Sequence, residues 1–123
     1  MSDAEWQVMK VIWENAPIAS NEVVKRVKQT NAWKDNTIYT LMTRLAKKEM
    51  IYIDKDSSPN LCSPLISEKE CKREERKSFL KKVYDGSLNL MLANIIEEDS
   101  LTESEIKELK SILDQKQNNV RKR

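Results

Sequence analysis

The side chains best suited to chemistry lie in one short run, residues 36–49, which reads NTIYTLMTRLAKKE. Its apolar residues recur at the spacing of a single helix face, and they are Ile38, Leu41, Met42 and Leu45. The opposite face gathers short polar and basic side chains, which are Thr37, Thr40, Thr43, Arg44 and Lys47. Solvated helix faces usually carry Glu, Lys and Gln rather than Thr, so this face indicates more than solvation.

Threonine and arginine on one helix face are suited to reading double-stranded DNA. A helix enters the major groove when small polar residues near its N-terminus can approach the base edges. A Thr methyl group packs on a thymine methyl, and an Arg guanidinium forks onto guanine or grips phosphate. At the far end of the helix, Lys47 and Lys48 are suited to the phosphate backbone. Tyr39 is ambiguous, because it can contact the groove or pack at the rim of the core.

The residue patterns that catalysis or a metal site usually needs are not found in the sequence. There is no histidine, which removes the commonest general base and metal ligand. Cys62 and Cys71 lie nine residues apart, a spacing that does not match a zinc site. No nucleophile stands beside a base, and no Gly-rich phosphate loop is present. The sequence predicts neither an enzyme nor a metal or other cofactor.

Charge and composition narrow the fold class and the partners. The chain has 123 residues and a net charge of +2. Residues 34–48 have a local excess of positive charge, because they include four basic residues and only one acidic residue, Asp35. One Gly and three Pro favour a mostly helical fold. No apolar run is long enough for a membrane span, and the start MSDAEWQVMK is unlike a signal peptide. We therefore expect a cytoplasmic protein without membrane insertion.

Residues 1–66 have the pattern of a winged helix-turn-helix domain. A capping box at Ser2 opens the first helix, which Pro17 ends. Ser20 is the expected cap of the second helix, and Asp35 or Asn36 that of the third, which runs to about residue 48. The strand-like runs MIYIDK and LCSPLI flank a polar turn at residues 56–60. The prediction is three helices and a two-stranded β-hairpin wing, whose Lys55 and Ser57 are possible backbone contacts.

Residues 67–123 predict three further helices and no strand. Capping boxes begin at Ser67 and Thr102, and the run SLNLMLANII between them is apolar on most sides. A helix of that kind must be covered on all sides, and a second copy of the chain can do so. The alternative is that these helices fold back on the first domain. The predicted dimerisation residues are Leu88, Met91, Leu92, Ile95, Ile96, Ile106, Leu109 and Leu113.

Three stretches resemble the BlaI/MecI-type penicillinase repressors: residues 4–13 (AEWQVMKVIW), 36–51 and 77–113. The resemblance implies a homodimeric winged-helix transcriptional repressor that binds a palindromic operator in double-stranded DNA ahead of antibiotic resistance genes. Tyr39 replaces an Arg that is common in the β-lactam repressors, and Glu49 replaces a usual Gly. The family's recognition-helix positions fall here on Asn36, Thr37, Tyr39, Thr40, Thr43 and Arg44.

The resemblance also implies induction by proteolysis. A membrane sensor-protease, or a protease downstream of it, would cut the dimerisation domain between Asn94 and Ile95, where the family more often has Phe after the Asn. The tail ILDQKQNNVRKR lacks the cysteine cluster of the copper-responsive relatives, which disfavours copper sensing. Two alternatives stay open: a winged-helix protein-interaction module, and a family repressor that responds to a different signal.

Overall fold

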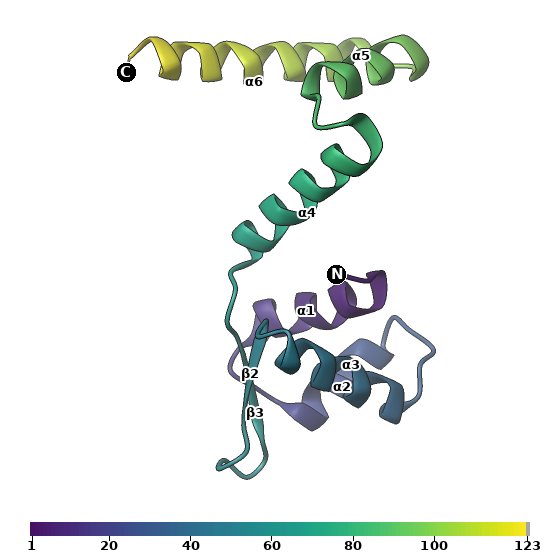
Figure 1. Ribbon diagram of the computed structural model, residues 1–123, viewed down its shortest axis with the longest axis vertical. Coiled ribbons are helices and arrows are strands. Elements are labelled where there is room, and N and C mark those ends of the chain that lie inside the picture. The colour runs from purple at the N-terminus through teal and green to yellow at the C-terminus, as the bar shows by residue number, and fades with distance from the viewer. Residues whose placement is uncertain (123) are drawn as a thin grey trace. The chain divides into compact units, whose positions relative to one another are not determined.

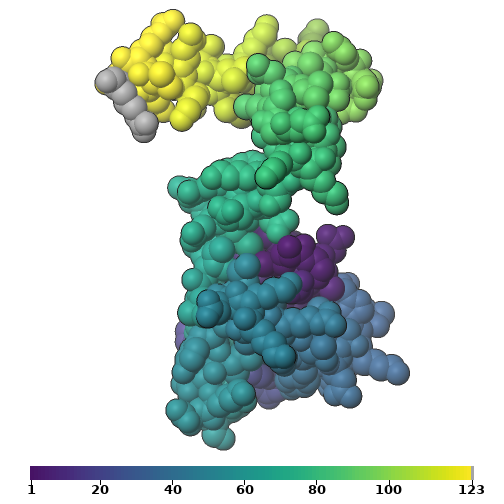
Figure 2. Space-filling model, in the orientation of Figure 1, coloured from purple at the N-terminus to yellow at the C-terminus, as the bar shows by residue number. Residues whose placement is uncertain are grey.

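The computed structural model describes residues 1–122. Contacts divide the chain into two compact units, Met1–Arg76 and Lys77–Arg123, which are coloured from purple to teal and from green to yellow (Figures 1 and 2). The division falls inside the helix α4 (Glu68–Tyr84). Among the described residues, no helix combines the length and the apolar character that a bilayer span requires.

The first unit is built on three helices and a small sheet. The helices are α1 (Asp3–Asn15), α2 (Ser20–Lys28) and α3 (Asp35–Lys47), and each packs on the other two (Figure 1). The strands β2 (Ile51–Asp54) and β3 (Leu61–Pro64) form the predicted hairpin. The mostly helical, winged-helix prediction is therefore confirmed.

The sheet has one strand more than the predicted two-stranded wing. The short strand β1 (Ile18–Ala19) pairs antiparallel with β3, which gives the order β1-β3-β2. Ile18 lies opposite Cys62, and the backbone N–H of Ser20 donates to the carbonyl of Asn60 at 2.9 Å. A strand of two residues is too short to produce an alternating pattern, so the sequence did not reveal it.

The core of the first unit joins all three helices to the sheet. At its edge, the indole N–H of Trp13 donates to the carbonyl of Ile66 at 2.9 Å, which ties the end of the hairpin to α1. This core fixes the position of α3 beside the wing. The buried side chains are Val8, Met9, Ile12, Ile18, Val23, Val24, Val27, Ile38, Leu41, Met42, Leu45, Ile51 and Cys62.

The helix caps agree with the prediction only in part. The capping box of Ser2 and Glu5 is present. Ser20 is not a cap, because α2 has Ala19 at its N-cap and the Ser20 hydroxyl lies 3.4 Å from the Cys62 sulfur. The predicted cap of α3 by Asp35 or Asn36 is also wrong, since Lys34 occupies that position without a side-chain bond.

The carboxylate of Asp35 pairs with Lys28 instead of capping α3. The Lys28 ammonium donates to this carboxylate at 2.7 Å. That ion pair spans the turn between α2 and α3 and offsets one negative charge beside the exposed face of α3. The sequence pattern could not show this pairing, because it depends on the path of the loop between the helices.

α3 ends in a left-handed turn that residue 49 makes without glycine. Glu49 has φ +60°, its N–H donates to Ala46 at 3.1 Å, and that of Met50 donates to Leu45 at 3.0 Å. These two bonds form a Schellman motif, in which Gly is the favoured residue at the position of Glu49. The backbone thus keeps a glycine-type turn into the wing although the side chain is Glu.

The second unit consists of the end of α4, α5 (Leu88–Glu98) and α6 (Glu103–Arg121). Ser87 caps α5 by accepting from the N–H of Leu90, and Thr102 forms the predicted capping box with Glu105. Between α4 and α5, Asp85 and Gly86 both adopt a positive φ, of +52° and +81°, a conformation in which Gly carries no steric cost. Within the described chain, neither α5 nor α6 has a buried residue.

Candidate nucleic-acid interface

The outer face of α3 is the candidate interface. Its apolar residues lie in the core, and Ile38 and Leu45 have no exposed area. A helix whose buried stripe takes the apolar side chains necessarily presents its polar ones to solvent. The exposed residues of this face are Asn36, Thr37, Tyr39, Thr40, Thr43, Arg44 and Lys47.

A shallow hollow runs over the first half of this face. It has a volume of about 280 Å³ and lies over the first two turns of α3. One side chain in its lining is a cation, Arg44, and no carboxylate takes part. Such a surface can accept a convex polar group from outside the protein. The residues that line it are Asn36, Thr37, Thr40, Leu41 and Arg44.

Two of the three threonine hydroxyls on this face, those of Thr40 and Thr43, donate within the helix. Thr40 donates its hydroxyl proton to the carbonyl of Asn36 at 2.8 Å, and Thr43 donates to Tyr39 at 3.0 Å. Because each hydroxyl proton is used within the helix, the outward-facing functions are an acceptor oxygen and a methyl group. In a major groove, these would match the amino groups of adenine or cytosine and the methyl group of thymine.

Lys48 has a partner inside the first unit. Its ammonium donates to both carboxylate oxygens of Glu5, at 2.8 and 3.1 Å. Glu5 is only 4% exposed, and it belongs to α1, which lies 43 residues away in the sequence. The pair fixes the end of α3 against α1. Lys48 therefore has a role in the fold that the sequence did not reveal, and its contact with phosphate stays a prediction.

The Glu5 carboxylate is strongly held in its ionised form. Burial alone raises its pKa, but hydrogen bonds from Lys48 and from the backbone N–H and hydroxyl of Ser2 outweigh that effect and lower the pKa to about 2. Glu5 thus combines two tasks, since it completes the capping box of α1 and anchors α3.

The wing contributes one exposed cation, Lys55, directly after β2. Its loop is held by the Asp54 carboxylate, which accepts from the N–H of Asp56 at 3.0 Å and from the Ser57 hydroxyl at 3.1 Å. Ser57 therefore uses its hydroxyl proton within the loop. Of the two predicted wing contacts, Lys55 and Ser57, only the Lys55 side chain takes no part in these hydrogen bonds of the loop.

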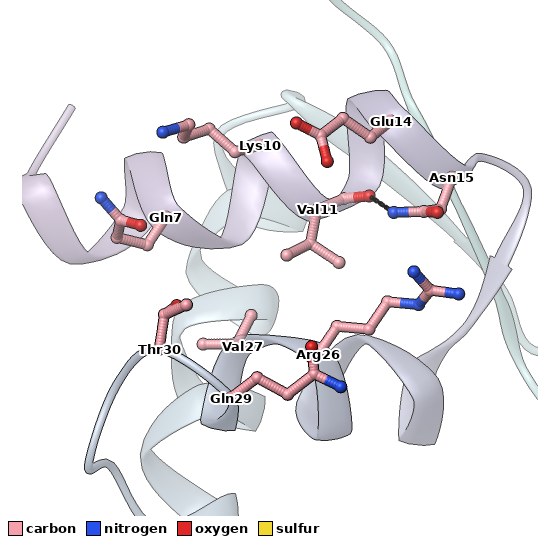
Figure 3. A pocket seen from close by; sticks show the side chains of 9 residues that line it. All are labelled: Gln7, Lys10, Val11, Glu14, Asn15, Arg26, Val27, Gln29 and Thr30. Atoms are coloured by element: carbon pink, nitrogen blue, oxygen red, sulfur yellow. Dashed lines mark hydrogen bonds between the residues drawn. The ribbon is translucent and has the colours of Figure 1, made fainter.

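A second hollow of about 310 Å³ lies between α1 and the end of α2 (Figure 3). Val11 and Val27 point toward each other across it, and Lys10, Glu14 and Arg26 stand at its rim (Figure 3). Throughout residues 1–122, every buried side-chain nitrogen or oxygen has a hydrogen-bond partner, so no buried polar group is left unpaired in the lining of this hollow. It is an open gap between two helices rather than an enclosed ligand site.

The predicted dimerisation residues form an uncovered apolar surface on the second unit. Leu88, Leu92 and Ile96 on α5 are 40–65% exposed, and Ile106, Leu109 and Leu113 on α6 are 39–64% exposed. Met91 and Ile95 are half-buried. Further exposed apolar residues lie outside the predicted dimerisation set, and two of them, Phe79 and Val83, stand one helical turn apart on α4. These further residues are Phe79, Val83, Leu90, Ile112 and Val120.

Asn94 and Ile95 lie in the middle of α5, and both side chains are half-buried. A protease binds its substrate as an extended strand, so this bond becomes accessible only when α5 unwinds locally. A helix without buried residues has little to oppose such unwinding while the chain is monomeric.

Comparisons with known proteins agree with this arrangement. The model of the family "Penicillinase repressor" matches residues 1–115. The penicillinase repressor of Bacillus licheniformis is 40% identical over 118 residues, which cover 96% of this chain and 92% of that protein. The methicillin resistance regulatory protein MecI of Staphylococcus aureus strain N315 is 36% identical over 116 residues, or 94% of each chain.

Two solved structures of a relative each match part of the chain. One is the DNA-binding domain of the repressor BlaI, with a TM-score of 0.53. The other is the monomeric form of Bacillus licheniformis BlaI in complex with the blaP half-operator, with a TM-score of 0.51. Each is 40% identical and covers 57% of this chain and 85% of the solved one. Members of the matched family are DNA-binding transcriptional repressors rather than enzymes. Because the family match extends over most of the chain, this protein belongs to the penicillinase repressor family.

Proposed function

We propose that this protein is a homodimeric repressor that binds a palindromic operator in double-stranded DNA and controls β-lactam resistance genes in the cytoplasm. The observation that carries the proposal is the outer face of α3, which exposes three threonines and Arg44 over a buried apolar stripe. The BlaI structure with its half-operator supports it, since that relative binds DNA with a similar domain.

Each residue of the interface has a chemical task in this proposal. Arg44, at the wall of the hollow, forks onto guanine or grips phosphate. Thr40 and Thr43 offer acceptors and methyl groups to the base edges. Asn36, Thr37 and Tyr39 occupy the family's remaining recognition positions. Lys47 on α3 and Lys55 on the wing neutralise phosphates, which makes binding sensitive to salt.

The uncovered apolar surface of the second unit supports the homodimer. Its large side chains lose contact with water only when another surface covers them, and a second copy supplies a matching one. A dimer holds two α3 helices for two half-sites of a palindrome. Binding of the second half-site is then intramolecular, so the affinity for the full operator depends on the dimer.

Induction by proteolysis follows from the same arrangement. A cut between Asn94 and Ile95, made by a membrane sensor-protease or by a protease downstream of it, divides α5 and removes α6 from the dimer. The two released first units would then bind half-sites independently, with the lower affinity of single domains. A repressor that answers to another signal would keep the same DNA interface and lack this cleavage.

The rival role of a protein-interaction module is disfavoured by the chemistry of α3. A docking helix presents an apolar stripe to its partner, whereas the apolar stripe of α3 is buried in its own domain. The outer face instead carries threonine, arginine and lysine, which favour a polar, negatively charged partner.

Replacement of Arg44 by Ala tests the interface. Gel shifts at fixed salt on the promoter of the protein's own gene should show operator affinity reduced by about 1–3 kcal/mol. Lys10→Ala on α1 is the matched control, because it removes one exposed cation outside the proposed interface. Equal affinities for the two variants and the parent protein would remove Arg44 from the interface. No specific shift by the parent protein would favour the interaction-module role.

A further inference from the structure

One side of α4 carries a stripe of basic residues that lies outside the candidate nucleic-acid interface on α3 and the wing. Its members recur at the spacing of one helix face, and all are exposed. In residues 1–122 only one of them, Lys72, forms an ion pair, with Glu68 at 3.2 Å. Over all of α4, seven basic residues outnumber four acidic ones. We name as the basic stripe Lys69, Lys72, Arg73, Arg76 and Lys77.

The opposite charge is concentrated where α5 ends and α6 begins. From residue 97 to residue 108, six acidic side chains stand against one basic side chain, Lys107. All six are exposed, and within residues 1–122 none forms an ion pair. We name as the acidic segment Glu97, Glu98, Asp99, Glu103, Glu105 and Glu108.

We propose that, in the homodimer, the basic stripe of each chain docks on the acidic segment of its partner. The inference rests on the proposed homodimer and adds to it the surface that sets partner choice and orientation. A two-fold symmetric dimer makes every contact between different patches twice, so one chain can supply both the stripe and the segment.

Both charged surfaces lie next to exposed apolar residues of the second unit. Phe79 and Val83 continue the face of the basic stripe along α4, and both are about half exposed. Ile96 directly precedes the acidic segment, and Ile106 and Leu109 lie within it or just beyond it. An interface with an apolar centre and a charged rim is the usual arrangement in protein complexes. The two charged surfaces therefore have the places expected of a rim around the proposed dimer interface.

A second copy fits the stripe better than DNA does. The recognition residues of α3 and the wing already account for a polar DNA surface in the first unit. If DNA bound the basic stripe, the acidic segment would have no partner. The DNA phosphates and the acidic segment are both negatively charged, so they would compete for the same basic residues. Pairing between chains satisfies both surfaces. A single exposed ion pair adds little to the affinity of a dimer. Like charges that face each other repel, so reversing the charge of several residues on one surface should weaken the dimer measurably.

Charge reversal tests the pairing. One variant carries Arg73→Glu and Arg76→Glu, and the other carries Glu97→Lys and Glu98→Lys. Sedimentation of the full chain at low salt should show each variant alone to dimerise at least about tenfold more weakly than the parent protein. Lysines in the last turn of α5 suit the helix dipole, so the second variant is not expected to lose helix stability.

Mixing the two variants is the decisive step. In the mixed dimer, the reversed stripe of one chain meets the reversed segment of the other, and the two unreversed surfaces meet each other, so both contacts become attractive again. With one variant carrying a mass tag, the heterodimer should regain the parent's dissociation constant within about threefold. Pairing within one chain would not give this recovery, because each variant would retain its own repulsion.

Other outcomes overturn the proposal in distinguishable ways. If both reversed variants dimerise like the parent, or if the mixture does not recover, the pairing is wrong while the homodimer stands. If the stripe variant dimerises normally and loses operator affinity, the stripe binds DNA instead. A parent protein that remains monomeric at all concentrations contradicts the homodimer itself. The control variant carries Lys10→Glu and Lys25→Glu, which change the net charge by the same amount as the reversed stripe does. Both residues lie in the first unit, away from the proposed contact, so this variant should dimerise like the parent.

Discussion

The two units of this chain bury their apolar residues to very different degrees. In the first, side chains from α1, α2, α3 and the sheet form one core, and Met9, Ile12 and Ile38 have no exposed area. In the second, α5 and α6 have no buried residue among those described, and Ile96 and Leu113 are each more than 60% exposed. Burial of apolar area is the main source of folding free energy, so we expect the first unit to be stable by itself and the second to gain stability when another surface covers it.

The difference in apolar burial fits the different roles that we propose for the two units. In the proposed function, a rigid core holds the exposed residues of α3 at fixed positions, as a base-reading surface requires. In the proposed homodimer, a second unit that only another copy completes would couple DNA affinity to protein concentration and to cleavage.

The largest effect is expected from Leu92→Asp in α5. A charge in the proposed dimer interface should dissociate the homodimer and weaken binding to the full operator on the order of 100-fold, because the second half-site is then bound by a separate molecule. The first unit should unfold as in the parent protein. Sedimentation and gel shift measure the two effects. Asn118→Asp near the end of α6 is the control, and a Leu92→Asp variant that stays dimeric would refute the interface.

A stability effect confined to the first unit is expected from Glu5. Its pKa is about 2 in the folded chain against 4.5 for the free side chain. A lowered pKa stabilises the fold above the unfolded value, so that stabilisation, at most about 3 kcal/mol, is present above pH 4.5 and is lost as the pH falls toward 2.

Glu5→Gln should remove this pH dependence and cost about 2 kcal/mol at pH 7, because Lys48 loses its charged partner. Urea unfolding from pH 7 to pH 2.5 gives both values. Glu14→Gln, an exposed carboxylate on the same helix, is the control. An unchanged slope of stability with pH in Glu5→Gln would show that this ion pair does not hold α3 to α1.

A smaller effect separates the two outward functions of Thr40. Thr40→Val keeps the methyl group and loses the acceptor oxygen, whereas Thr40→Ser keeps the oxygen and loses the methyl group. If the fixed acceptor reads a base amino group, Val should weaken operator binding by about 1–2 kcal/mol and Ser by less than about 0.5 kcal/mol. Gel shifts at fixed salt give both numbers. The reverse order would mean that the methyl group makes the contact.

The smallest effect concerns the turn that ends α3. Glu49→Gly should stabilise the first unit by about 1 kcal/mol, since a non-glycine residue at φ +60° is strained. Lys47→Gly, at the last residue of α3 and without a positive φ, should instead lower stability, by up to about 0.5–1 kcal/mol. Thermal unfolding compares the two variants. A loss of stability in Glu49→Gly would mean that the Glu side chain makes a contribution larger than the strain.

Helical periodicity and local capping patterns were sufficient to predict much of this fold. The stripe of Ile38, Leu41, Met42 and Leu45 predicted both the burial of α3 and its exposed face. The Ser2 and Thr102 capping boxes identified helix starts, because each box is made within four residues. These features depend on near neighbours in the sequence, which is why the sequence reveals them.

The features that the sequence could not show depend on residues brought together by the fold. β1 forms because Ile18 meets Cys62, and Ser20 is drawn to the same strand instead of capping α2. Asp35 pairs with Lys28 across a loop. Such contacts between segments leave no periodic pattern in the sequence. The fixed hydroxyls of Thr40 and Thr43 are local by contrast, and the i–4 carbonyl rule for threonine in helices could have predicted them.

The most direct test of the account compares two DNA duplexes, one with the full operator and one with a single half-operator, in gel shifts at fixed salt with sedimentation of the free protein. The account predicts a salt-sensitive, sequence-specific complex of a dimer with the full operator. Its affinity should exceed that for the half-operator on the order of 100-fold. Equal affinity for the two duplexes, or binding without sequence preference, would contradict a dimer that reads two half-sites through α3.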